Sequence, residues 1–159
     1  MSTELYIQNI KKLDEKLGLS KPIELDSSLG VTLILNHKNP LVLHISYDIE
    51  QNLVQIQSHI TTHFPKSRIG VQTIMNELVG DLLLHNRSAG KLKADPTDNS
   101  IQLIKTIDLK KAEENTLALF LPLYTKTALT WREKFDQVTL KSQKSSFNRE
   151  EEILSFHKV

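Results

Sequence analysis

Hydrophobic and polar positions alternate along this chain in a way that predicts a helix, three strands, a second helix, two strands and a final helix. Apolar residues recur at helical spacing from Leu5 to Leu17, and Gly18 stands where a helix commonly ends, so we predict a helix over about 3–17. Three short runs rich in β-branched residues follow, and turn residues separate them. They predict an antiparallel meander over 31–36, 41–47 and 53–59.

The second of these strands predicts a sheet with two unlike faces. Every second residue from Leu41 to Tyr47 is apolar, whereas the other face carries Val42, His44 and Ser46. This pattern is typical of a strand with one covered face and one partly covered face. We therefore expect His44 to be a half-buried sheet residue rather than an acid or base, and its face is the one with room for a ligand.

A second helix is predicted between Pro65 and Gly90. Its apolar stripe is unusually wide, which indicates burial on more than one side and fits a contact with another subunit. The residues expected at the dimer interface are Ile69, Ile74, Leu78, Val79 and Leu82.

A hairpin and a final helix complete the predicted elements. Strands over 91–95 and 100–107 flank an evident turn at 96–99, and the helix then begins after Asp108 or Asn115. Phe120, Tyr124 and Trp131 lie at helical spacing, so we expect core packing there. We expect the helix to end near Trp131 or Phe135.

Pro122 and the polar C-terminal segment qualify this picture. Because proline removes a backbone donor, we expect a kink or break at Pro122. From about Lys141 onward the sequence is polar and mixed in charge. We expect one domain over 1–140 and a flexible tail over 141–159.

Composition narrows the classes of function. The 159 residues are 39% hydrophobic and 25% charged, as in ordinary soluble domains, and a net charge of +1 does not indicate nucleic-acid binding. With no cysteine the chain has no disulfide and no zinc-thiolate site. It starts polar and has no run of about eighteen apolar residues, so we expect a cytoplasmic protein without a membrane span.

Catalytic chemistry finds little support in the residues. His59 and His63 have the spacing of a zinc-binding helix, but Ile60 stands where the catalytic Glu would be, so we expect no metal. No glycine-rich phosphate loop occurs, and no nucleophile, base and oxyanion donor come together. We expect no cofactor and no enzymatic activity, although an enzyme of unrecognised type stays an alternative.

The order of elements resembles the class I type III secretion chaperones of bacteria. The best local matches are the segment Gly90–Asp95 with its turn, the strand Ile101–Ile107, and the late residues Ala128 and Trp131. The resemblance covers residues 3 to about 138. It implies an α+β fold with an antiparallel five-stranded sheet and three main helices, in the order α-β-β-β-α-β-β-α, as a homodimer associated through the second helix.

The resemblance also implies a function. Such a chaperone binds an extended segment of a type III secretion effector and keeps it soluble and export-competent, and the secretion ATPase is a further partner. A dimeric regulatory or adaptor domain of the same architecture, unrelated to secretion, stays an alternative. The expected effector-binding residues are Leu5, Ile10, Leu13, Ile34, Val42, Leu92 and Ile104.

Overall fold

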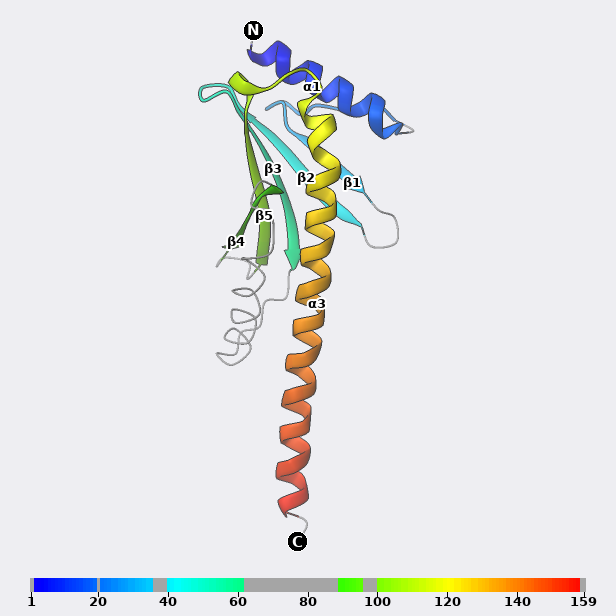
Figure 1. Cartoon of the computed structure of the whole chain (residues 1–159), viewed down its shortest axis with the longest axis vertical. Coiled ribbons are helices and arrows are strands. Elements are labelled where there is room, and N and C mark those ends of the chain that lie inside the picture. The colour runs from blue at the N-terminus through cyan, green and yellow to red at the C-terminus, as the bar shows by residue number, and fades with distance from the viewer. Residues whose placement is uncertain (1, 20, 36–39, 62–88, 96–99, 158–159) are drawn as a thin grey trace.

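The computed structural model describes residues 2–19, 21–35, 40–61, 89–95 and 100–157. Its strands form one five-stranded sheet, in which every neighbouring pair is antiparallel and the order is β1-β2-β3-β5-β4 (Figure 1). The predicted sheet is thereby confirmed. The strand bounds are β1 Val31–Leu35, β2 Leu41–Asp48, β3 Leu53–Thr61, β4 Lys91–Asp95 and β5 Ser100–Asp108.

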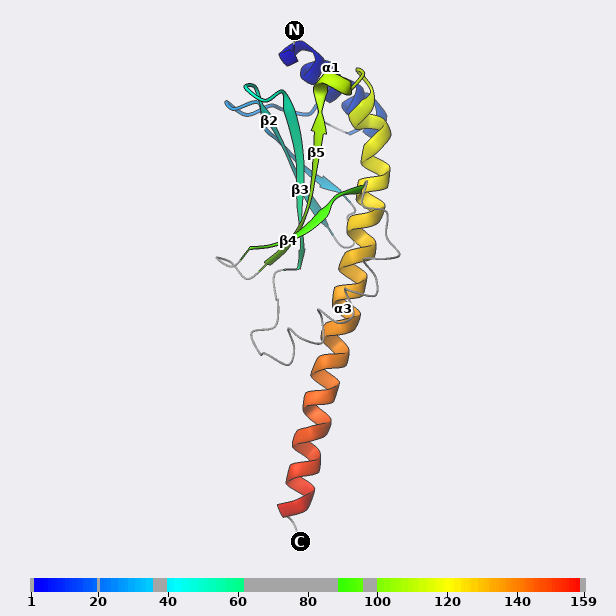
Figure 2. The same cartoon turned by 60° about the vertical axis from the view of Figure 1, so that its left-hand side comes forward.

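The helices gather on one side of this sheet. Helix α1 spans Ser2–Leu17 and lies across the start of α3, which spans Thr116–His157 and runs down the face of the sheet (Figures 1 and 2). The short 3₁₀ helix η2, Leu109–Lys111, links β5 to α3. The helix expected over 69–84, and with it every expected dimer-interface residue, lies outside the described residues.

Cross-strand register assigns each strand residue to one of the two faces. An inner row joins Leu43, Ser58, Leu103 and Leu92, and it faces α3. Burial alternates strictly along β2, with every second residue from Leu41 to Tyr47 buried, as the sequence predicts. Alternate residues in a strand point to opposite faces, so one shift in register would expose this whole row.

On the outer face the expectation for His44 is wrong. Its side chain is exposed, and its Nδ1 lies 3.3 Å from Thr32 Oγ1 on the neighbouring strand. The outer row continues from His44 through Gln57 and Ile104 to Lys91. Polar side chains dominate this face, and no described helix covers its β1–β2 part.

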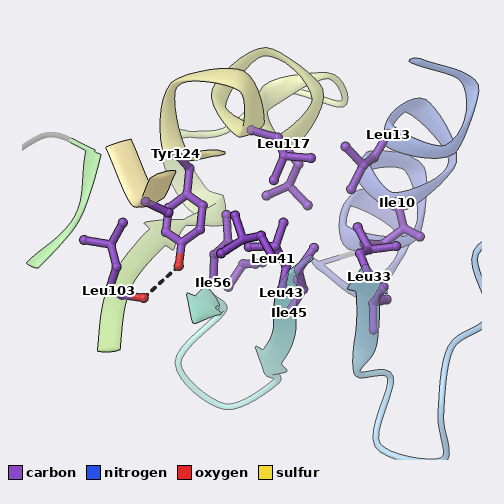
Figure 3. Close-up of a cluster of buried hydrophobic side chains, with 14 of the residues drawn as sticks. Ile10, Leu13, Leu33, Leu41, Leu43, Ile45, Ile56, Leu103, Leu117 and Tyr124 are labelled. Carbon is purple, nitrogen blue, oxygen red and sulfur yellow. Dashed lines mark hydrogen bonds between the residues drawn. The ribbon is translucent and has the colours of Figure 1, made fainter. Parts of the chain in front are cut away.

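Tyr124 anchors α3 to the middle of the sheet. Its side chain is fully buried, and its hydroxyl donates to the Leu103 carbonyl oxygen at 2.7 Å (Figure 3). Ser58 Oγ lies 2.8 Å from the same hydroxyl. Burial raises the pKa of Tyr124 to about 12, so the hydroxyl keeps its proton and stays a donor. Trp131 is buried as expected, whereas Phe120 is only half-buried, beneath the ammonium of Lys105.

Tyr6 fixes α1 to the sheet near the C-terminal end of β2. Its ring stacks on Tyr47 of β2 with centroids 4.5 Å apart, and its hydroxyl donates to the Leu29 carbonyl oxygen at 2.6 Å. Desolvation, with a smaller effect of Asp26, raises the pKa of Tyr6 to about 12. An aromatic pair and a partly buried hydrogen bond thus hold a helix that the sequence alone places only by its apolar spacing.

Helix α3 differs from its expected form in two respects. It passes through Pro122 without a break, and it continues beyond Trp131 to His157, well past the lower edge of the sheet (Figure 1). The boundary between a domain over 1–140 and a tail stays a prediction. Within the described part of the chain, neither helix is apolar enough over a sufficient length to cross a membrane.

Candidate functional site

An apolar groove of about 520 Å³ opens between α1 and α3, beside the end of β1. We call it the α1–α3 groove. Most of its lining comes from α1 and α3, which lie at opposite ends of the sequence, and the polar side chains of the lining belong to the same two helices. The lining residues are Leu13, Lys16, Leu17, Leu35, Ala118, Leu121, Pro122, Thr125, Lys126, Leu129, Thr130 and Glu133.

Pro122 explains how Lys16 is held at this groove. Proline has no N–H, so the carbonyl of Ala118, four residues earlier, receives no bond from the helix. Lys16 Nζ of α1 donates to this oxygen at 2.7 Å. The carbonyl group that Pro122 leaves without its usual helix partner thereby forms a contact that ties α1 to α3.

Asn9 makes a second tie between the same helices. Its side chain is fully buried, Nδ2 donates to the carbonyl oxygens of Leu5 and Glu113 at 2.9 Å each, and Oδ1 accepts from Leu117 N at 3.1 Å. Leu117 lies in the first turn of α3, where backbone N–H groups have no partner within the helix. A residue of α1 therefore caps α3, and together with Lys16 it fixes the spacing of the groove walls.

The outer sheet face carries a smaller apolar patch. Ile34 and Val42 are direct cross-strand neighbours, 62% and 37% exposed. Further along the face, Gln57 Nε2 donates to Gln102 Oε1 at 2.6 Å, and Gln102 Nε2 lies 3.4 Å from His59 Nε2. The patch is therefore confined to the β1–β2 hairpin.

A second hollow, of about 540 Å³, lies at the β2–β3 turn. Its lining includes Ser46, Asp48, Gln51, Gln55 and Thr106. Although its volume is similar to that of the α1–α3 groove, its lining is mainly polar. The α1–α3 groove is therefore the better candidate for binding an apolar segment.

The structure distributes the expected effector-binding residues over three places. Ile10 and Leu13 belong to the core, with Leu13 also lining the groove, and Leu5 packs beside them half-buried. Ile34 and Val42 meet on the outer face, which Ile104 shares, whereas Leu92 lies on the inner face. Their role in binding stays a prediction.

Sequence reasoning missed most of the groove, including Leu17, Leu35, Pro122, Lys126 and Leu129. These residues are separated by up to about a hundred positions in the chain, and no local pattern joins them. Asn9 did leave a signal, because it interrupts the buried face between Tyr6 and Ile10. A polar residue on such a face needs hydrogen-bond partners.

The spacing of His59 and His63 raises metal binding as a further possible chemistry. Within the described ranges, no group of three or more His, Asp or Glu side chains is placed to hold a metal ion. His63, the second histidine of the zinc-like spacing, lies outside those ranges.

Comparison with known proteins shows which solved structures share the fold of this chain. No protein-family model and no curated protein matches the chain. Among solved structures, a chain of the HopA1–SchA chaperone–effector complex matches with a TM-score of 0.62 and 19% identity, over 84% of this chain and 97% of that one. A chain of the complex between the Yersinia pestis type III secretion chaperone SycH and a fragment of YscM2 matches with a TM-score of 0.56 and 16% identity, over 82% of this chain and 99% of that one. The chain has the fold of the type III secretion chaperones.

The likeness extends over nearly the whole length of the matched chains. A chain of the ExsC–ExsE complex also has a TM-score of 0.62, at 12% identity, covering 84% of this chain and 94% of that one. Identities this low show a shared fold, and function has to be argued from the site.

Proposed function

We propose that this protein is a non-enzymatic chaperone that binds an extended segment of a type III secretion effector in the bacterial cytoplasm. Binding would keep the effector soluble and competent for export. The observation that carries the proposal is the α1–α3 groove, an apolar and open surface within a chaperone fold. All three similar structures described above are complexes: HopA1–SchA, which is a chaperone–effector complex, ExsC–ExsE, and SycH with a fragment of YscM2.

The energetics of such binding favour a long client segment. A segment that becomes ordered on binding loses roughly 2–5 kcal/mol or more of its interaction energy to entropy. The groove alone offers a limited apolar surface, so the segment needs further contacts. The Ile34–Val42 patch and the backbone edges of β1 and β4, the outermost described strands, can supply them.

A charge placed in the groove should weaken client binding strongly. We expect Leu129→Asp to reduce affinity at least about tenfold, because the carboxylate loses water without gaining a partner. Pro122→Glu tests the same wall at an exposed position, where losing proline removes a helix breaker. The client is identified by mass spectrometry after co-purification, and its affinity for each purified variant is then measured by calorimetry.

Leu119→Asp is the matched control for this experiment. Leu119 lies on α3 but outside the groove lining, and it is 67% exposed. We expect this variant to bind the client with unchanged affinity. If Leu129→Asp and Pro122→Glu also bind the client like the unmodified protein, while circular dichroism shows that they are folded, the groove is not the client site.

We propose further that the protein is a homodimer associated through the stripe of residues 69–84. The apolar stripe of this segment is wider than a helix needs to pack against its own domain. A second side of the helix is therefore expected to be buried against another subunit. Light scattering should therefore report twice the chain mass at micromolar concentration, and Leu78→Asp should shift it toward monomer or aggregate. A monomer mass for the unmodified protein would reject the dimer and leave the groove proposal standing.

A further inference from the structure

The walls of the α1–α3 groove restrict the backbone conformation of whatever binds there. Apart from Leu35 at the end of β1 and Lys16 and Leu17 in the last turn of α1, the groove is lined mainly by residues inside helices, whose N–H and C=O groups bond within the helix. The carbonyl that Pro122 leaves free, that of Ala118, is taken by Lys16 Nζ. An extended chain would therefore bury backbone groups without partners, at a cost that a helix avoids by bonding to itself.

Charged residues of opposite sign make the two ends of the α1–α3 groove different. Lys126 and Glu133 both line it from α3 and stand seven residues apart, which is two helical turns or about 10 Å. Lys16 adds a second positive charge beside Ala118, toward the end of the groove where α3 begins. Neither Lys126 nor Glu133 has an ion-pair partner among the described residues.

We infer that Lys126 and Glu133 are specificity-determining residues that select the direction of an amphipathic client helix in this groove. The bound helix carries a carboxylate opposite Lys126 and a lysine or arginine opposite Glu133, about two turns apart. Its apolar side chains fill the space beside Leu13, Leu121 and Leu129. The inference rests on the proposed function, and it adds that the client segment, extended elsewhere, is helical over the one stretch that enters the α1–α3 groove.

A displayed peptide library tests this directly. Its members share the apolar stripe of the client's own groove-binding helix, whose unlike side chains distinguish the two directions, and two flanking positions seven residues apart are each varied among Glu, Lys and Gln. Sorting on the unmodified protein should enrich one order of the opposite charges by about fivefold or more over the reversed order. The doubly substituted protein with Lys126→Glu and Glu133→Lys keeps its net charge, and it should enrich the reversed order.

The control pair lies on α1 with the same spacing. Glu4 and Lys11 are exposed, stand seven residues apart and do not line the groove. A protein with Glu4→Lys and Lys11→Glu should keep the original preference. Competition between the peptide and the co-purified client confirms that both occupy the groove.

The outcomes separate this inference from the proposed function. Binding without preference for charge order, or a preference that survives the Lys126 and Glu133 exchange, overturns the direction-selecting role while leaving the groove as client site. If no helical peptide binds, but Leu129→Asp still lowers the affinity for the client, the part of the client that occupies the groove is not a helix. If the client itself ignores groove substitutions, the proposed function fails as well.

Discussion

Trp131→Ala should lower the free energy of unfolding by about 3–5 kcal/mol, the largest stability effect expected in this chain. The indole is only 4% exposed and packs on the ring of Phe135, with centroids 6.3 Å apart. Removing it leaves a cavity between α3 and the sheet that a continuous helix cannot easily close. Urea unfolding followed by circular dichroism measures the change, at one fixed protein concentration because a dimer would make stability depend on concentration.

Leu119→Ala is the matched control on the same helix. Its side chain is mostly exposed, so we expect a change of less than about 1 kcal/mol. An equally small effect of Trp131→Ala would show that the indole is not a core residue, and it would reopen an aromatic contact with a partner.

Asn9→Leu should lower the free energy of unfolding by about 2–3 kcal/mol. Leucine is similar in size but cannot accept from Leu117 N or donate to the Glu113 carbonyl oxygen, so the buried start of α3 loses its cap. Because Asn9 also helps set the spacing of the groove walls, client affinity should fall in the same variant. Urea unfolding and calorimetry measure the two effects separately.

Gln8→Leu provides the comparison for Asn9. Gln8 is the preceding residue of α1 and its side chain is exposed, so the same substitution should change stability by less than about 0.5 kcal/mol. If Asn9→Leu unfolds at the same urea concentration as the unmodified protein, the capping contact contributes nothing to the junction between α1 and α3.

The sheet could be predicted because its signals are local. Alternation along β2 and turn residues between strands identified the elements, and the bounds of β1 to β5 differ from expectation by at most two residues. Exposure of His44 could not be read in this way, because it depends on whether another element covers the outer face. Likewise, the contact of Lys16 with the Ala118 carbonyl oxygen could not be predicted from the sequence, because the two residues lie 102 positions apart.

The groove was harder to predict than the fold for a related reason. Leu13 is apolar at helical spacing whether it faces the core, the groove or both, and the structure shows that it does both. Lys126 and Glu133 read as ordinary solvent-exposed charges on a helix. Only the crossing of α1 over α3 makes them the rim of one surface.

Hydrogen exchange on the purified complex of this protein with its client tests the central claim most directly. We expect slowed exchange over a long client segment that exchanges freely when isolated, together with new protection in α1 and in the first half of α3. The same client mixed with the Leu129→Asp variant should lose the protection that maps to the groove. Protection confined to a compact client domain that is already folded in isolation, with no change in α1 or α3, would contradict the account.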